Sequence, residues 1–342
     1  MEELSYKASG VDLEAAQSFK EQLAAIVNPT HGENILSGVG GFGAAYKLAN
    51  YKSPILISST DGVGTKLRLA ILLENYDTIG EDLVNACVND ILVSGADPLF
   101  FLDYIAVGAL QEEVLLALIK GIARACEYNS CALIGGETAQ MPGMYSGSDF
   151  DMAGFVLGAV EEKALIDGKN IVPDDILIGI PSNGLHTNGY SLARKIFDTD
   201  NGSHMLCEYD SILGSTYGEA LMLPHTPYFK TVSAVRHLVK GMAHVTGGGL
   251  IENIPRVLPS RVAAVIDNTS WEIPQIFRSL QLKGNIPQDE MFRVFNMGIG
   301  MVIVSSPANA PIILSKLSDS KIIGSVIEQN QPDSKQVIIE NV

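Results

Sequence analysis

The sequence predicts an α/β or α+β protein with two domains. Short apolar runs of strand length alternate with longer amphipathic stretches through the whole chain. The pattern of strand, glycine loop and helix begins again at residue 176, which indicates a second domain. A chain of 342 residues is long enough for two domains that each bury a core. We place the boundary in the turn-rich stretch 161–175 and expect a first domain over 1–165 and a second over 170–342.

The first domain is predicted from five segments. Residues 54–58 form a short apolar run of strand length, and residues 131–134 and 151–160 follow the same pattern. Residues 82–94 predict a helix, because at about 100° per residue their apolar side chains gather on one side and their polar ones on the other. A second helix is expected over residues 111–128.

The second domain starts with an apolar strand over residues 176–180. A polar glycine loop follows, and then a helix from about Tyr190; a later glycine run precedes a helical start near Leu250. The two halves also end alike, since Phe150-Asp151-Met152 precedes one late strand and Phe295-Asn296-Met297 precedes another. This similarity hints at an internal duplication but is too short to establish one.

Composition excludes several classes of protein. Charged residues make up 18 % of the chain and hydrophobic ones 46 %, the opposite of a disordered protein. With 23 Lys and Arg against 39 Asp and Glu, the net charge is −16, so nucleic acid is not an expected partner, although phosphorylated small molecules are compatible. The four cysteines form no CxxC pair, the first residues lack signal-peptide features, and the most apolar window, 104–123, contains charges. We therefore expect a cytoplasmic protein without a membrane segment.

The first of four glycine-rich regions is Gly38-Val39-Gly40-Gly41-Phe42-Gly43, which matches the G-x-G-x-x-G pattern of dinucleotide-binding folds. Its context does not fit that function. Little room is left for a strand before the glycines, and Pro54 ends the following helix after about ten residues. We favour a flexible surface loop, which can also close over a bound nucleotide as a lid.

Three acidic residues at strand ends or on a helix edge are candidate metal ligands. Asp61 follows the first predicted strand and opens a loop of glycines, Thr65 and Lys66, where Mg²⁺ and phosphate can be held together. This loop is not a Walker A sequence, since only one residue separates its glycines. Asp90 lies near the edge of the apolar side of its helix, and Glu137 follows a strand in the third glycine-rich region. Together the three suit Mg²⁺; taken alone, each is an ordinary surface acid or the cap of a tight turn.

Two glycine-rich regions of the second domain are candidate phosphate sites. Residues 182–191 separate a strand from a helix, and Thr246-Gly247-Gly248-Gly249 precedes another helix. Backbone N–H groups at a helix N-terminus bind phosphate without a lysine, which suits an acidic protein. His186 is the only side chain of its loop with an ordinary pKa near neutrality. It is a candidate acid or base, or simply a hydrogen-bonding residue.

A series of short motifs runs through nearly the full chain: Ser5-Tyr6-Lys7, Gly40-Gly41-Phe42-Gly43-Ala44, Thr60-Asp61-Gly62-Val63-Gly64-Thr65-Lys66-Leu67, Cys87-Val88-Asn89-Asp90, Pro98-Leu99-Phe100-Phe101-Leu102-Asp103-Tyr104, Gly135-Gly136-Glu137-Thr138-Ala139-Gln140-Met141-Pro142-Gly143-Met144-Tyr145, Asn188-Gly189-Tyr190-Ser191-Leu192, Thr246-Gly247-Gly248-Gly249 and Glu252-Asn253-Ile254-Pro255-Arg256-Val257-Leu258-Pro259. In content and order these motifs closely resemble the family of phosphoribosylformylglycinamidine cyclo-ligase, also called aminoimidazole ribonucleotide synthetase, of purine biosynthesis. Two positions depart from the family pattern, since Ala8 stands where an acidic residue is usual and Thr187 where a serine is common.

The resemblance implies an enzyme, a ligase that forms a C–N bond and uses ATP and Mg²⁺. ATP phosphorylates the formamide oxygen of formylglycinamidine ribonucleotide, and the amidine nitrogen then attacks the activated carbon. Phosphate leaves, and the products are aminoimidazole ribonucleotide and ADP. This chemistry is sensible because the formamide oxygen is a very poor leaving group until it is phosphorylated, and because the ring closure joins two groups of one molecule.

The resemblance also implies the two-domain α/β (α+β) fold of that family, with mixed sheets and flanking helices. It implies a homodimer whose N-terminal domains join their sheets. It places nucleotide and Mg²⁺ on Asp61, Asp90 and Glu137, with Asp61, Asp90 and His186 as candidate catalytic residues. Further nucleotide contacts are expected from the lid and from the loop after the first strand: Gly40, Gly41, Phe42, Gly43, Gly62, Gly64, Thr65 and Lys66, the last near phosphate. The ribose phosphate of the substrate is expected at Ser182, His186, Asn188, Thr246, Gly247 and Gly248.

Other functions are compatible with parts of this pattern. Selenophosphate synthetase and thiamine-phosphate kinase share the architecture, but the former should carry a reactive Cys beside its N-terminal glycine loop, and the first Cys here is Cys87. The only support for a nicotinamide oxidoreductase is the glycine pattern at residues 38–43. A non-catalytic nucleotide-binding protein would keep the glycines and could lose the carboxylates. Asp61, Asp90 and Glu137 are all present here, which favours an enzyme.

Overall fold

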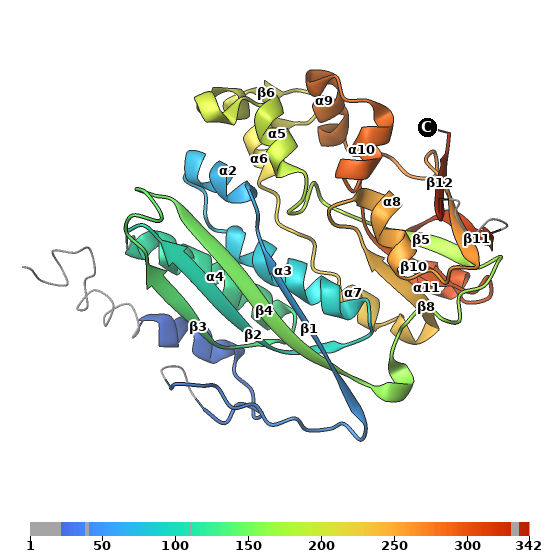
Figure 1. The fold of residues 1–342 in the computed structure, drawn as a ribbon, viewed down its shortest axis with the longest axis horizontal. Helices are drawn as coiled ribbons and strands as arrows, with labels where there is room; N and C mark the ends of the chain where they lie inside the picture. Colours follow the sequence, from blue (N-terminus) through green and yellow to red (C-terminus); the bar gives the residue numbers. More distant parts are fainter. Residues whose placement is uncertain (1–21, 38–40, 110, 330–334, 342) are drawn as a thin grey trace, which may run out of the picture.

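The computed structural model describes residues 22–37, 41–109, 111–329 and 335–341. Its strands form a four-stranded sheet from the first half of the chain, a six-stranded sheet from the second half and a small two-stranded sheet. Figure 1 shows the two large sheets in separate parts of the molecule, the first at the lower left and the second at the right. The prediction of mixed sheets with flanking helices is confirmed.

The four-stranded sheet has the order β1-β4-β2-β3, and the helices α3 and α4 cover one of its faces, behind the sheet in Figure 1. β4 runs antiparallel to both of its neighbours, and β2 and β3 are parallel. The bounds of these elements are β1 Pro54–Gly62, α3 Ile79–Leu92, β2 Asp97–Val107, α4 Glu112–Tyr128, β3 Ala132–Gln140 and β4 Phe150–Glu161.

Two strands extend beyond the predicted segments. β1 continues past residue 58 through Asp61, because Asp61 is still paired with Gly154 of β4. β3 continues past residue 134 through Glu137, which is paired with Tyr104 of β2. The sequence prediction of loops at Asp61 and Glu137 is therefore wrong, and the alternation of the strands sets the direction of both side chains.

The other face of the four-stranded sheet carries exposed apolar side chains. Leu56, Phe155 and Tyr104, on the three adjacent strands β1, β4 and β2, are 54 %, 36 % and 41 % exposed. Alternation along β2 puts Tyr104 on the face opposite to the buried Phe101. A contiguous apolar surface of this kind is typical of an interaction site.

The six-stranded sheet has the order β12-β9-β11-β5-β10-β8. β10 is buried along its whole length and runs antiparallel to both β5 and β8. The predicted strand at 176–180 and the helix from Tyr190 are confirmed as β5 and α5. The strands are β5 Ile176–Pro181, β8 Val239–His244, β9 Val262–Asp267, β10 Ile299–Ser305, β11 Lys321–Glu328 and β12 Val337–Glu340.

Short helices and turns complete the described part of the chain, and many of them lie around the second sheet (Figure 1). The remaining α-helices are α2 Lys66–Leu72, α5 Tyr190–Ile196, α6 Tyr217–Leu221, α7 Phe229–Ser233, α8 Gly249–Asn253, α9 Gln275–Gly284, α10 Gln288–Val294 and α11 Ala310–Lys316. The 3-10 turns are η1 Asn28–Thr30, η2 Glu162–Ala164, η3 Thr199–Asn201, η4 His204–Cys207, η5 Arg236–Leu238 and η6 Ile254–Arg256, and the two-stranded sheet pairs β6 Tyr209–Asp210 with β7 Ser215–Thr216.

The polar side of α3 packs against the second half of the chain. Asn85 Nδ2 donates to the His225 carbonyl at 2.7 Å, and Asn89 Nδ2 donates to the Thr226 carbonyl at 2.9 Å. Asp82 Oδ1 accepts a hydrogen bond from His225 N at 2.7 Å. Asp82, Asn85 and Asn89 are all buried, so this side of the helix forms an internal interface whose polar groups are matched by hydrogen bonds.

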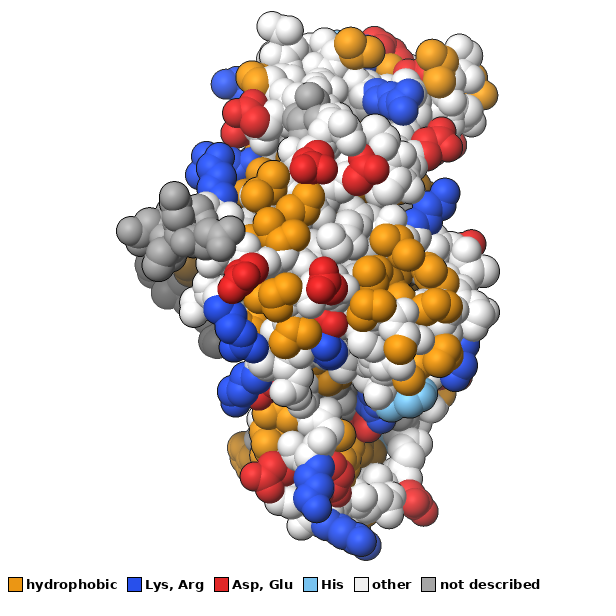
Figure 2. Space-filling view, turned by 90° about the vertical axis from the view of Figure 1, so that its right-hand side faces the viewer, with side chains coloured by type: hydrophobic (Ala, Val, Ile, Leu, Met, Phe, Trp, Pro, Cys, Tyr) orange, Lys and Arg blue, Asp and Glu red, His pale blue; other side chains and the backbone are white. Residues whose placement is uncertain are grey.

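The surface in Figure 2 carries charges of both signs. Lys and Arg side chains are scattered there among acidic and apolar ones and do not gather into one basic patch on this face. Within the part of the chain that the structure describes, every helix is too short or too polar to cross a bilayer.

Candidate functional site

Asp61 and Asp90 come together where β1 passes α3. Ser59 Oγ donates to Asp90 Oδ2 at 2.9 Å, and Ser59 and Asp61 share one face of β1 because side chains alternate along a strand. Burial raises the pKa of Asp61, and the nearby charge of Asp90 raises it too. A cation bound between Asp61 and Asp90 would stabilise the ionised form of both carboxylates.

Asp90 is tied to the second half of the chain through His244. The distance from His244 Nδ1 to Asp90 Oδ1 is 2.8 Å. Burial alone would raise the pKa of Asp90, but the hydrogen bond and charge of His244, with the Ser59 hydroxyl, outweigh burial and hold that pKa below its usual range. Asp90 is therefore ionised at neutral pH, and 35 % of its side chain is exposed.

Glu137 does not join these two carboxylates within one chain. It lies on β3, which β4 and β2 separate from β1. Three strand spacings place the two strands about 14 Å apart. The register aligns Asp61 with Gly154 and Asp103, whereas Glu137 aligns with Tyr104 in the next row, on the opposite face. A single Mg²⁺ ion therefore cannot be bound by all three residues of one chain.

Lys66 lies where a phosphate cannot reach it. Its side chain is fully buried, its Nζ lies 2.7 Å from Asp82 Oδ2, and it donates to the Leu223 carbonyl at 2.7 Å. Burial lowers the pKa of Lys66, although the Asp82 carboxylate opposes this shift. This geometry argues against the expected contact between Lys66 and a phosphate. Lys66 points inward because its partner, Asp82, lies on the buried side of α3.

The loop between Asp61 and Lys66 meets the glycine loop of the second half. A Cβ on Gly64 would lie 3.8 Å from the Thr187 carbonyl, and Thr65 Oγ1 lies 3.2 Å from Ser191 Oγ. Gly64 has φ +63°, a conformation that favours glycine. Gly62 is the last residue of β1 before this loop, and its N–H donates to Asp61 Oδ1 at 2.7 Å.

The expected lid is only partly described. Gly41, Phe42 and Gly43 are exposed, and the Phe42 ring has no cover from the described residues. Gly40 lies outside the described residues, as do the motif Ser5-Tyr6-Lys7 and the departure at Ala8. An exposed aromatic ring beside glycines is compatible with a segment that folds over a ligand, and the lid stays a prediction.

Most of the expected phosphate-binding residues lie close together. A Cβ on Gly247 would lie 3.4 Å from Asn188 Oδ1, which places the two loops of the second half side by side. Gly248, with φ +94°, precedes α8, and Thr246 Oγ1 donates to Asn253 Oδ1 at 3.1 Å. Ser182 is different, because it is buried and its hydroxyl donates to Asn296 Oδ1 at 2.9 Å.

His186 is buried inside the junction of the two halves. Its ring stacks on that of His225 with 4.0 Å between centroids, and its Nε2 lies 3.0 Å from Thr226 Oγ1. Its φ of +62° is unusual for a residue with a side chain and is typical of functional sites. Burial, followed by the charges of His244 and Lys66, lowers the pKa of His186 well below its usual value, so the ring is a neutral base at pH 7.

Sequence reasoning missed His225 and His244. The two Nε2 atoms are 2.9 Å apart, so a chain of contacts leads from His225 through His244 to Asp90. His244 ends the apolar strand β8 just before a glycine run, the same signal that pointed to Asp61 and Glu137, and it could have been found. His225 lies between Pro224 and Pro227 in a segment without periodicity, which carried no such signal.

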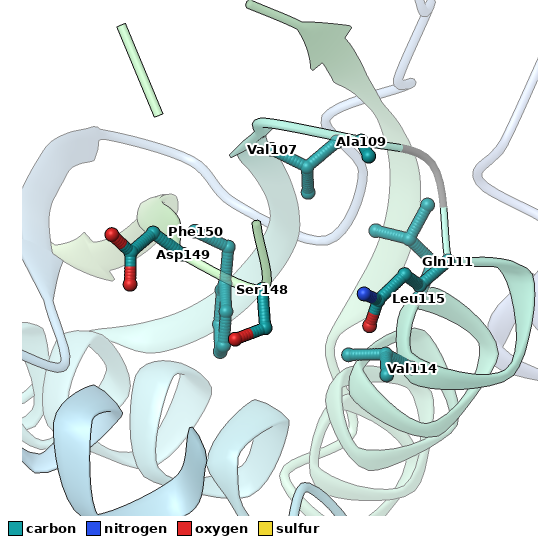
Figure 3. A pocket seen from close by; sticks show the side chains of 8 residues that line it. All are labelled: Val107, Ala109, Gln111, Val114, Leu115, Ser148, Asp149 and Phe150. Carbon is teal, nitrogen blue, oxygen red and sulfur yellow. The ribbon is translucent and has the colours of Figure 1, made fainter. Parts of the chain in front are cut away.

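Two hollows in the first half lie apart from these residues. Figure 3 shows a small one of about 10 Å³, where Gln111 and Ser148 face a mainly apolar lining. A larger one of about 330 Å³ is lined by residues 29–35 and by Tyr46 and Glu127 among others. Neither is lined by Asp61, Asp90 or the histidines. Asp61 is exposed, and we call the surface around Asp61 and Asp90 the open edge.

Comparison with known proteins decides the family. Residues 43–160 match the AIR synthase related protein, N-terminal domain, and residues 172–335 match the AIR synthase related protein, C-terminal domain. A phosphoribosylformylglycinamidine cyclo-ligase of Thermoanaerobacter pseudethanolicus is 47 % identical over 330 residues, which covers 95 % of this chain and 98 % of that protein. The chain belongs to the phosphoribosylformylglycinamidine cyclo-ligase family.

Solved structures with the same fold extend beyond the cyclo-ligase family. HypE of E. coli superposes with a TM-score of 0.67 at 17 % identity and covers 95 % of this chain and 94 % of its own. A hydrogenase maturation protein HypE in complex with ATP has a TM-score of 0.66 at 15 % identity, with coverage of 97 % and 93 %. These likenesses confirm the predicted two-domain fold, and the much higher identity to a cyclo-ligase favours that family over sister enzymes.

Proposed function

We propose that this chain is an ATP-dependent ligase that converts formylglycinamidine ribonucleotide to aminoimidazole ribonucleotide with release of ADP and phosphate. The observation that carries the proposal is the 47 % identity to a cyclo-ligase over 95 % of the chain. The adjacent carboxylates Asp61 and Asp90, beside glycine loops from both halves, agree with it.

The reaction separates into two steps. The γ-phosphoryl group of ATP moves to the formamide oxygen, so the bond to the β-phosphate oxygen breaks and a P–O bond to the substrate forms. The amidine nitrogen then attacks the formamide carbon, the C–O bond breaks, and phosphate leaves while the nitrogen loses a proton. The protein supplies no covalent nucleophile; it orients two groups of one molecule, which can provide several kcal/mol of the barrier reduction.

Asp61 and Asp90 fit a magnesium ion. Both supply oxygen ligands, which Mg²⁺ prefers, and among the described residues no Lys or Arg forms a salt bridge with Asp61. When bound, Mg²⁺ would neutralise charge on the nucleotide phosphates. Asp61 and Asp90 would hold the ion, and Ser59 and His244 would keep Asp90 ionised and oriented.

The substrate phosphate is proposed to bind beside Asn188, Thr246, Gly247 and Gly248. The loops that carry these residues meet, and Gly247 is exposed and Gly248 half-buried there. Backbone N–H groups of such glycines can bind an anion without a lysine. Ser182 and the buried His186 would support this surface from beneath.

We also propose a cytoplasmic homodimer that uses the open face of the four-stranded sheet. Leu56→Glu combined with Phe155→Glu places two charges on exposed apolar positions of adjacent strands. We expect the wild type to sediment as a dimer and the double variant as a monomer in sedimentation velocity. Leu282→Glu, at a leucine of α9 that is 80 % exposed, is the control and should stay dimeric. A monomeric wild type, or a double variant that still dimerises, contradicts this interface.

Direct assay tests the activity. Purified protein with ATP, Mg²⁺ and formylglycinamidine ribonucleotide should release ADP and an aminoimidazole, detected by diazo coupling, in equal amounts. Glycinamidine ribonucleotide without the formyl group is the matched control, because it offers no formamide oxygen to phosphorylate. Absence of both products under reducing conditions would overturn the proposed function.

A further inference from the structure

Three of the six histidines of the chain gather where the two halves meet. His186, His225 and His244 are buried, and each offers one ring nitrogen that lies within 4.8 Å of the others. They come from the loop after β5, the segment between α6 and α7, and the end of β8. Burial lowers the pKa of His186 and His225 well below the usual value, so each of these two rings is neutral at pH 7 and carries a lone pair.

His244 is oriented like a metal ligand. Asp90 is ionised and can only accept, so His244 Nδ1 holds the proton of their 2.8 Å hydrogen bond. In a neutral ring the lone pair is then on Nε2, which points at His225 Nε2, 2.9 Å away. Metal-binding histidines commonly place their second ring nitrogen on a carboxylate in this way.

His186 presents a ring nitrogen that nothing satisfies. Its Nδ1 is buried and has no hydrogen-bond partner among the described residues. Its Nε2 lies 3.0 Å from Thr226 Oγ1, whose own proton is donated to Asn183 Oδ1 at 3.0 Å. The Thr226 N–H also approaches this Nε2, at the longer distance of 3.4 Å. The shorter contact with the hydroxyl, whose proton is already donated, assigns the N–H of His186 to Nε2 and the lone pair to Nδ1. A buried lone pair without a donor costs free energy unless something binds it.

We propose that His186, His225 and His244 form a site for one divalent transition-metal ion of the class of Zn²⁺, separate from the Mg²⁺ proposed at Asp61 and Asp90. Imidazole nitrogens suit this class, whereas Mg²⁺ prefers oxygen.

Zn–N bonds of about 2.0–2.1 Å in a tetrahedral site require nitrogens about 3.3 Å apart. The Nε2 atoms of His225 and His244, now 2.9 Å apart, therefore separate slightly when the ion binds, and the His186 ring adjusts to reach it. At the same time the proton that His225 Nε2 donates to His244 moves to His225 Nδ1, which lies 3.4 Å from Thr187 Oγ1, so that Nε2 can coordinate and His225 stays neutral. The inference rests on the histidine geometry alone and not on the proposed function.

Cobalt titration tests this site, because Co²⁺ substitutes for Zn²⁺ and absorbs visible light. Chelator-treated full-length protein is titrated with Co²⁺ in excess Mg²⁺, which fills oxygen sites. We expect one ion per chain with nitrogen-ligand absorption bands. His225→Gln should weaken binding at least about 10-fold. The control variant, His204→Ala with His237→Ala, removes two exposed histidines and should bind like the wild type.

A second measurement does not depend on a variant that folds. With histidine labelled in ¹⁵N, long-range ¹H–¹⁵N spectra of the wild type report each ring nitrogen, and Zn²⁺ should shift signals of three histidines and leave three unchanged. The proposal is overturned if the wild type binds no Co²⁺, if the control variant loses as much affinity as His225→Gln, or if thiolate charge-transfer bands show binding at the exposed Cys207.

Discussion

The two loops that follow the first strand of each sheet make an informative pair. Residues 59–66, which are the end of β1 and the loop after it, present Asp61 beside Asp90 of α3 at an open edge. Residues 182–189, which follow β5, carry the buried His186. The loops touch, through Gly64 and the Thr187 carbonyl. The loop at residues 59–66 therefore offers carboxylate charge to a cation. The loop at residues 182–189 offers backbone groups at its surface and the neutral imidazole of His186 in its interior. In the proposed function, this difference lets an acidic protein bind phosphates without lysine.

The sheets that carry these loops are built alike. β4 lies between β1 and β2, and β10 lies between β5 and β8, with all four pairings antiparallel. The triplets Phe150-Asp151-Met152 and Phe295-Asn296-Met297 stand at or just before the starts of these two central strands. The two sheets thus share a strand arrangement but differ in chemistry, because the residues at the ends of their strands differ.

The largest expected effect comes from removing the buried ammonium of Lys66, which ends the first of these loops and binds Asp82 and the Leu223 carbonyl. Lys66→Met leaves Asp82 buried without its cation, and we expect a loss of about 3–5 kcal/mol in the free energy of unfolding. The pKa of Asp82 is already raised by burial to about 6, above its unfolded value. An acid whose pKa is raised by folding stabilises the folded state at low pH, and this stabilisation is lost as pH rises through the folded pKa. The loss of unfolding free energy in Lys66→Met should therefore grow between pH 5 and pH 8.

Denaturant unfolding at several pH values measures this effect. Lys169→Met, which removes an exposed lysine paired with Asp167, is the control and should change stability little at any pH. An equal loss in both variants, or a Lys66→Met deficit that shrinks toward pH 8, contradicts the assigned role of the buried pair.

The next effect concerns the open edge. Asp61→Asn keeps the shape of the side chain but removes its charge, and we expect kcat/KM to fall by roughly 100- to 1000-fold with the fold intact. Steady-state kinetics with circular dichroism measures both quantities. Glu328→Gln, on the exposed side of β11, is the matched control. An unchanged rate in Asp61→Asn would remove this carboxylate from the site.

The smallest effect tests the contact between the two loops. Thr65→Ala removes one partner of the 3.2 Å hydroxyl pair with Ser191, and we expect a loss of about 1 kcal/mol or less. A double-mutant cycle with Ser191→Ala should show coupling, since the two residues share one hydrogen bond. Strictly additive losses would mean that the loops do not support each other here.

Sequence patterns predicted much of this molecule, and the failures have physical causes. The strands β1, β3, β4 and β5 and the helices α3 and α4 followed from apolar runs and periodicity, and Asp61 and Asp90 do come together. The strand β2, in the middle of the first sheet, was not predicted. Glu137 was misplaced because strand order is a long-range property that no local pattern records. Lys66 was misplaced because its burial depends on Asp82, which faces the second half of the chain.

A structure with a non-hydrolysable ATP analogue and Mg²⁺ tests the central claim most directly. We expect the metal ion to be coordinated by Asp61 and Asp90, with the phosphates beside residues 62–65. Binding of the analogue away from both carboxylates, for example in the hollow beside Tyr46 and Glu127, would contradict it.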